Sequence, residues 1–308
     1  MNRDLPNHPP SQPPAPRLGL VCITTDQAIR FRAITRARWL RLELDEQHKV
    51  LGELYRANLA RLLNALRYCD QHNIQLYRVT SNLFPLCDEP VGERVLDAMA
   101  DRLTQVGRQA ERRQVRVVAH PDQFVVLSSD RPEVIATSIH IMQRHARVFD
   151  LLGLPRSPWS ALILHGGKGN RADTLERIVG ELPAAVRTRL ALENDERAYS
   201  ANEILAVCRH TGTPMVFDAH HHVIKEGLDS FEHPSVAELV EASRETWPDP
   251  AWQLVHLSNG RTGIRDARHS ELITTYPSAY EHTPWVEVEA KGKERAIAEL
   301  RRIWPRAR

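Results

Sequence analysis

Residues 189–218, RLALENDERAYSANEILAVCRHTGTPMVFD, contain the repeating unit that decides the fold. The short apolar run Arg189–Leu192 is followed by an amphipathic stretch over Ser200–His210 and by a second apolar run, Pro214–Phe217. Neither run has the polar alternation of a half-exposed strand, which is typical of parallel strands buried on both faces. The segment therefore predicts a strand, a crossover helix and a second parallel strand.

The same alternation extends in both directions from this unit. Apolar runs predict eight strands at Leu18–Ile23, Ile74–Val79, Val115–Ala119, Ala161–Leu164, Arg189–Leu192, Pro214–Phe217, Gln253–Leu257 and Trp285–Val288. Amphipathic patterns predict helices at Leu51–Gln71, Val91–Arg113, Pro132–Leu152, Thr174–Leu182, Ser200–His210, Ser235–Thr246 and Lys291–Trp304. Eight such repeats predict a (β/α)8 TIM barrel, and no GxGxxG of a doubly wound sheet follows the first strand. Residues 258–283 are irregular, with one short helix expected near Arg268–Thr274.

Length and composition suit one large barrel domain. The chain has 308 residues, and 42% of them are hydrophobic. Six prolines in residues 1–16 predict a disordered tail, which leaves a barrel domain over residues 17–308. No apolar run reaches the ~18 residues of a membrane-spanning helix. Four cysteines without CxxC spacing argue against a zinc ribbon or a disulfide scaffold and indicate a reducing cytoplasm.

Residue types that commonly bind metals stand at the carboxyl ends of the predicted strands, where barrel enzymes have their active sites. The strand-end residues are His120, His165, Glu193, Asp218, His256 and Glu289. His221 follows shortly after Asp218, and His269 lies in the irregular segment. Burying these groups together is costly unless divalent cations compensate them. Nitrogen and oxygen donors without cysteine suit zinc, manganese or iron, and they exceed what one ion needs.

Two enzyme classes fit a site for several divalent ions. Enzymes that hydrolyse phosphate esters use such ions to activate water and to offset charge on the leaving oxygen. Sugar isomerases and epimerases on metal-binding barrels carry similar residues, but they need a closed small-molecule pocket rather than a long basic groove. The residues alone leave both classes open.

Six motifs resemble those of the UV damage endonuclease family, a family related to endonuclease IV and to xylose-isomerase-like barrels. They are YRVTSNLFP at Tyr77–Pro85, HPDQF at His120–Phe124, LEND at Leu192–Asp195, FDAHH at Phe217–His221, VHLS at Val255–Ser258 and VEAKGK at Val288–Lys293. The resemblance covers roughly residues 17–300. It implies an enzyme that nicks double-stranded DNA immediately 5′ to cyclobutane pyrimidine dimers and 6-4 photoproducts. The products would carry a 3′-hydroxyl and a 5′-phosphate.

The resemblance also implies roles for individual residues. The implied metal ligands are His120, His165, Glu193, Asp218, His221, His256, His269 and Glu289. The implied cofactor is Mn²⁺, as two or three ions, with Mg²⁺, Co²⁺ or Zn²⁺ as alternatives. Gln123 and Phe124 fall where the family places a Gln-Tyr pair that probes the damaged site, which resembles base flipping. Four positions depart from the family: Leu20, Thr24 and Phe124 replace a tyrosine, an asparagine and a tyrosine, and Leu254 replaces a lysine reported as modified.

Cationic and polar side chains complete the predicted DNA-binding set. Lys291 and Lys293 follow Glu289 and would neutralise a phosphate, so we expect them to act with Glu193 in catalysis. The remaining candidates for DNA contact are Asn82, Lys168, Arg30 and Arg32. The two arginines belong to a cluster with interleaved aromatic residues, which suits nucleic acid but equally a solvated helix face. For Arg78 we favour a role in the barrel rim.

We therefore expect a monomeric, cytoplasmic endonuclease that associates with the nucleoid when it acts on DNA. The alternatives are a sugar isomerase or epimerase, an AP-type endonuclease, and a non-catalytic sensor of DNA damage on the same fold.

Overall fold

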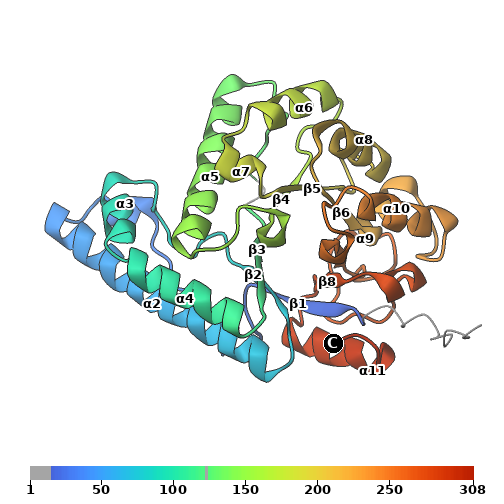
Figure 1. Cartoon of the computed structure of the whole chain (residues 1–308), viewed down its shortest axis with the longest axis horizontal. Helices are drawn as coiled ribbons and strands as arrows, with labels where there is room; N and C mark the ends of the chain where they lie inside the picture. Colours follow the sequence, from blue (N-terminus) through green and yellow to red (C-terminus); the bar gives the residue numbers. More distant parts are fainter. Residues whose placement is uncertain (1–14, 122–123) are drawn as a thin grey trace, which may run out of the picture.

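The computed structural model describes residues 15–121 and 124–308, and its eight strands close into one parallel barrel (Figure 1). The strands are β1 (Arg17–Val21), β2 (Leu76–Val79), β3 (Arg116–Ala119), β4 (Leu162–His165), β5 (Leu190–Glu193), β6 (Met215–Asp218), β7 (Leu254–Leu257) and β8 (Trp285–Val288). Each boundary lies within two residues of the predicted one. The TIM barrel is thus confirmed. The tail predicted over residues 1–16 falls outside the described residues, apart from Ala15 and Pro16.

Helices surround the barrel in the predicted alternation. They are α1 (Arg36–Trp39), α2 (Leu44–Gln71), α3 (Pro90–Asp97), α4 (Ala100–Arg112), α5 (Pro132–Leu151), α6 (Ala172–Glu181), α7 (Ala184–Arg187), α8 (Ala201–Thr211), α9 (Ala219–Glu226), α10 (Pro234–Arg244) and α11 (Glu294–Ile303). The single helix predicted over Val91–Arg113 is wrong, because the chain leaves helical geometry at Met99. This break lets α3 and α4 both pack on α2 while α4 also reaches α5. No helix of the described residues is long and apolar enough to cross a membrane.

The segment between β7 and β8 is irregular rather than helical near Arg268–Thr274, which corrects the short helix predicted there. Gly260 forms an antiparallel bridge with His269. The Asn259 side chain accepts the backbone N–H groups of Thr274 (2.8 Å) and Thr275 (3.2 Å). These N–H groups are therefore taken by a side chain instead of a helical turn. A 3₁₀ helix, η3 (Ser278–His282), follows.

The lower half of the barrel interior is apolar. It contains Leu76, Val118, Ala161, Ile163, Ala191, Val216, Leu254 and Trp285, with Trp247 beneath them. One charged side chain, the fully buried Arg116, completes this floor. Side chains alternate along a strand, so residues two positions apart point to the same side. The residue that lies two positions after each of most of these apolar residues therefore also points into the barrel, nearer the carboxyl end of its strand. The apolar floor therefore confines the inward-facing polar groups to the upper half of the barrel.

No carboxylate of the described residues bonds to Arg116 in the floor. Its guanidinium donates hydrogen bonds to the carbonyls of Pro158 (3.0 Å), Trp159 (2.8 Å) and Trp252 (2.8 Å). It also stacks over the rings of Trp159, Trp247 and Trp285, at 4.9–5.5 Å from their centroids. Burial lowers the pKa of Arg116 to about 9. Backbone dipoles and aromatic faces thus stabilise this buried cation.

Candidate metal centre

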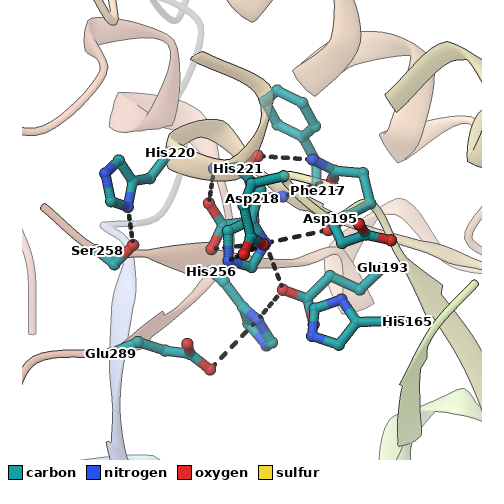
Figure 2. Close-up of polar contacts among 12 residues, drawn as sticks. His165, Glu193, Asp195, Phe217, Asp218, His220, His221, His256, Ser258 and Glu289 are labelled. Atoms are coloured by element: carbon teal, nitrogen blue, oxygen red, sulfur yellow. Dashed lines mark hydrogen bonds and ion pairs between the residues drawn. The ribbon is translucent and has the colours of Figure 1, made fainter. Parts of the chain in front are cut away.

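Neighbouring strands bring the predicted ligands together at the carboxyl end of the barrel. The strand register pairs His165 with Glu193 and Asp218 with His256. His120 and Glu289 directly follow β3 and β8. Figure 2 shows that side chains from β4, β5, β6, β7 and the end of β8 converge on one space. The short parallel strands therefore place carboxylates and imidazoles side by side without any help from long loops.

Glu193 lies at the centre of this group, and its side chain is only 1% exposed. Oε1 is 2.9 Å from Nδ1 of His256 and 3.4 Å from Nδ1 of His221. Oε2 is 3.1 Å from Nε2 of His120. Burial alone would raise the pKa of Glu193, but the surrounding histidines hold it well below its usual range. Glu193 is therefore an anion with both oxygens facing the site.

Asp218 is fully buried and has one oxygen left over. Its Oδ1 accepts the backbone N–H of His221 (2.8 Å) and so caps the start of α9. The Asn194 side chain bonds both the N–H (3.0 Å) and the C=O (2.9 Å) of the Asp218 backbone. Oδ2 accepts no hydrogen bond from the described residues. A buried carboxylate oxygen without a donor is costly, and a cation is the partner that fits it.

Three groups of donor atoms lie close enough to hold a metal ion. They are His120 with His165 and Glu193, Glu193 with Asp218 and His221, and Asp218 with His256 and Glu289. Within each group the donor atoms lie within 4.8 Å of one another. Glu193 and Asp218 each belong to two groups, so neighbouring sites would share carboxylates. Histidine nitrogen and carboxylate oxygen are the donors that divalent transition metals prefer.

His269 is the eighth predicted ligand and lies at the margin of the metal centre. Its Nδ1 is 3.9 Å from Oε2 of Glu289, and its ring centroid is 6.5 Å from that of His221. It belongs to none of the three groups found among the described residues. His220 and His222 face elsewhere, because their rings bond the hydroxyls of Ser258 and Ser235 at 2.8 Å. The structure thus gathers seven of the eight predicted ligands.

Arg78 and Glu287 lie directly beneath the ligands. We expected Arg78 in the barrel rim. Its side chain instead points into the barrel and pairs with two carboxylates. Nη1 lies 2.6 Å from Oε1 of Glu287 and also contacts Oε1 of Glu289. Glu287 is fully buried and was not among the site residues predicted from the sequence. Its position two residues before Glu289 was the available signal, since it places both side chains on the same face of β8.

The two predicted catalytic lysines differ in their surroundings. Lys293 precedes α11 with φ 48° and ψ −117°, a conformation that non-glycine residues rarely adopt. It is half-buried, and burial lowers the pKa of its amine. Lys291 is exposed. Both lysines line a hollow of about 490 Å³ together with Arg268 and His269, so cationic groups border the metal centre on this side.

The predicted DNA-contact residues lie at the surface. Phe124 is 73% exposed, whereas Gln123 falls outside the described residues. Lys168 follows Gly167, which has φ 89°, and its amine pairs with Asp130 at 2.6 Å. Asn82 is also exposed.

The segments that carry Arg32 and Asn82 are tied together by a buried asparagine. The Asn58 side chain bonds the backbone N–H and C=O of Arg32, each at 2.8 Å, and the C=O of Leu83 at 2.9 Å. Arg32 itself is exposed, and Nε of Arg30 donates to Oε1 of Gln27 at 2.7 Å. These two loops are thus anchored to α2.

Comparisons with known proteins find relatives along nearly the whole chain. The family model for UV-endonuclease UvdE matches residues 16–305. The UV DNA damage endonuclease of a Nostoc strain is 52% identical over 291 residues, 94% of this chain and 90% of that protein. The enzyme of the same name from Deinococcus radiodurans is 51% identical over 293 residues, 94% and 96% of the two chains.

Solved structures share the barrel. The crystal structure of SacUVDE superposes with a TM-score of 0.75 at 23% identity, covering 94% of this chain and 99% of that one. Endonuclease IV from Thermus thermophilus gives 0.60 at 14% identity, covering 94% and 98%. These likenesses concern the fold, whereas the family model and the close relatives bear on identity. The chain belongs to the UV DNA damage endonuclease family.

Proposed function

We propose that this protein uses a centre of two or three divalent ions to nick double-stranded DNA immediately 5′ to UV photoproducts, both cyclobutane pyrimidine dimers and 6-4 photoproducts. The products would be a 3′-hydroxyl and a 5′-phosphate. One observation carries the proposal: three donor groups share Glu193 and Asp218 at the barrel mouth of a UV DNA damage endonuclease family member. Ions spaced by shared carboxylates suit hydrolysis of a phosphodiester.

The chain offers donors for a divalent metal, and we propose Mn²⁺ as the native ion, with Mg²⁺, Co²⁺ or Zn²⁺ as substitutes. The proposed ligands are His120, His165, Glu193, Asp218, His221, His256, His269 and Glu289. Bound there, such ions lower the pKa of water and offset charge on the phosphate oxygens. Two carboxylates support this assignment. Oδ2 of Asp218 accepts no hydrogen bond from the described residues, and Glu193 is anionic, so a bound cation would stabilise each of them.

Other side chains would bind and orient the substrate. Lys293, with Lys291 at the outer edge of the same hollow, would neutralise the phosphate at the cut or beside it. Phe124 would stack on a base at the lesion, where pairing is already weakened. Arg30, Arg32, Asn82 and Lys168 would contact the DNA backbone, together with Gln123 at the probing position. The partial or full exposure of these four supports this role, although Lys168 must first release Asp130.

The decisive experiment compares nicking of irradiated and undamaged duplex DNA. Protein stripped with a chelator should be inactive, and Mn²⁺ should restore cuts 5′ to the lesion only in irradiated duplex. Single-lesion duplexes carrying a dimer or a 6-4 photoproduct define the lesion range, and end-labelling defines the termini. Equal cleavage of both duplexes without metal would refute the proposal.

Further arms of the same experiment address the alternatives. Cleavage only of a duplex with an abasic site would favour an AP-type endonuclease. Lesion binding without cleavage at any metal concentration would favour a sensor. Conversion of a ketose without DNA cleavage would favour a sugar epimerase.

We also propose one barrel domain over residues 17–308, a monomeric state, and a cytoplasmic, nucleoid-associated location. Elution at the 35.1 kDa of one chain would support the monomer. Elution at twice that mass would contradict it.

A further inference from the structure

His256 lies between two sets of carboxylates, and its two ring nitrogens face opposite ways. Nδ1 is 2.9 Å from Oε1 of Glu193 and 3.5 Å from Oε1 of Glu289, which are both proposed ligands. Nε2 is 3.2 Å from Oε1 of Glu287, but neither atom has a hydrogen-bond partner among the described residues, so two buried polar atoms face each other without hydrogen-bond geometry. The β7–β8 register places Glu287 directly beside His256, so this arrangement follows from the backbone.

Glu287 is fully buried below the metal centre and lies outside the three donor groups found among the described residues. Its nearest charged partner is Nη1 of Arg78, at 2.6 Å. The same Nη1 contacts Oε1 of Glu289. Arg78 thus offsets the negative charge of Glu287 in the barrel interior and joins Glu287 to a proposed ligand.

A histidine that binds a metal through one nitrogen usually donates its other N–H to a carboxylate, which sets the tautomer and the ring direction. His256 is arranged for this pattern, with Nδ1 toward the proposed ions and Nε2 toward Glu287. The opposite assignment would turn the metal-binding nitrogen toward Glu287, away from Glu193, Asp218 and Glu289.

We propose that Glu287 is a positioning residue for the metal centre. With metal bound, Glu287 accepts the Nε2–H of His256 after a turn of either side chain brings this 3.2 Å contact into hydrogen-bond geometry, and Nδ1 is left free to bind metal. Through Arg78, Glu287 also holds the carboxylate of Glu289 toward the same ion. This inference rests on the proposed metal-dependent function and adds two residues, Glu287 and Arg78, which touch neither metal nor DNA.

The first test measures binding of Mn²⁺ alone to the full-length chelator-treated protein, by electron paramagnetic resonance of free Mn²⁺. Loss of a carboxylate of this kind typically weakens metal binding by about 10- to 100-fold. We expect a loss in that range for Glu287→Gln. Asp150→Asn is the matched control, because Asp150 pairs with the buried Arg189 at 2.9 Å away from the mouth. It should leave Mn²⁺ affinity unchanged, and unchanged affinity in Glu287→Gln would overturn the proposal.

The second test needs no change to Glu287 and therefore stands even if Glu287→Gln does not fold. Long-range ¹H–¹⁵N spectra of histidine-labelled wild-type protein, loaded with Zn²⁺, report which ring nitrogen carries a proton. His256→Gln identifies the resonance. We expect a protonated Nε2 and a metal-bound Nδ1, and a metal-bound Nε2 would overturn the proposal.

The proposed function and the proposed role of Glu287 can be refuted independently of each other. If lesion-directed nicking is absent but Glu287→Gln weakens Mn²⁺ binding, Glu287 still positions a metal centre of another function. If nicking follows the proposal while Mn²⁺ affinity and the His256 tautomer do not, only the role of Glu287 is refuted.

Discussion

Replacing Glu193 with glutamine tests the centre of the site with the smallest change of shape. Glutamine keeps the volume and one accepting oxygen, but it removes the negative charge and turns the second oxygen into an N–H donor. Glu193 belongs to two of the three donor groups. A single substitution therefore affects two of the proposed ion positions at once.

The size of the effect follows from the ion positions that are weakened. Loss of a carboxylate that only supports a metal ligand typically costs about 10- to 100-fold in metal affinity or activity, and loss of a ligand costs at least as much. Because Glu193 belongs to two donor groups, we expect nicking to slow by about 10²- to 10⁴-fold. DNA binding should persist, because Glu193 is too deeply buried to reach the substrate.

The assay is single-turnover nicking of irradiated duplex over a range of Mn²⁺ concentrations, with fluorescence anisotropy for DNA binding. Glu176→Gln is the matched control, since Glu176 is also a carboxylate paired with a histidine, His210, but on the outside of the barrel. Thermal unfolding shows whether each variant is folded. A folded Glu193→Gln protein that nicks at nearly the wild-type rate would refute the reasoning.

Three further predictions concern the surroundings of the centre. Lys293→Met should slow nicking by about 10- to 100-fold, because one charged contact to phosphate is lost. Lys291→Met should slow it less, and equal losses in single-turnover rates would contradict the distinction drawn from burial. Phe124→Ala should weaken binding to lesion DNA by about 5- to 150-fold, the equivalent of ~1–3 kcal/mol of stacking. Its melting temperature should not change, since Phe124 is exposed, and anisotropy with damaged and undamaged duplex measures the difference. Arg116→Ala should lower the free energy of unfolding by about 3–5 kcal/mol, because three carbonyls lose their donor and a cavity opens. An unchanged urea concentration at the midpoint of unfolding would contradict this prediction for Arg116→Ala.

The barrel was predictable because parallel strands buried on both faces leave an unbroken apolar signal. The positions of His165, Glu193 and Asp218 were predictable for a related reason, since each ends its strand and all strands of a barrel point the same way. Such features depend on local sequence and on one topological rule. They required no knowledge of distances between strands.

Other features depend on contacts that sequence patterns do not record. The break near Met99 depends on how α3 and α4 pack on α2. The irregular segment around Thr274 depends on the side chain of Asn259, which lies 15 residues earlier in the sequence. The role of Glu287 becomes visible only when the β7–β8 register pairs it with His256. A carboxylate in mid-strand resembles any other until its neighbour across the sheet is known.

The Arg116 floor has a consequence for how the barrel closes during folding. Its hydrogen-bond acceptors come from the β3–β4 and α10–β7 connections, 42 to 136 residues away in sequence. These partners assemble only when both halves of the chain have met, and contacts of such separation form slowly. Four of the six tryptophans, Trp159, Trp247, Trp252 and Trp285, surround this point. The intrinsic tryptophan fluorescence of the protein should therefore report chiefly on the last stage of barrel closure. Refolding kinetics of that stage can then be followed without an added label.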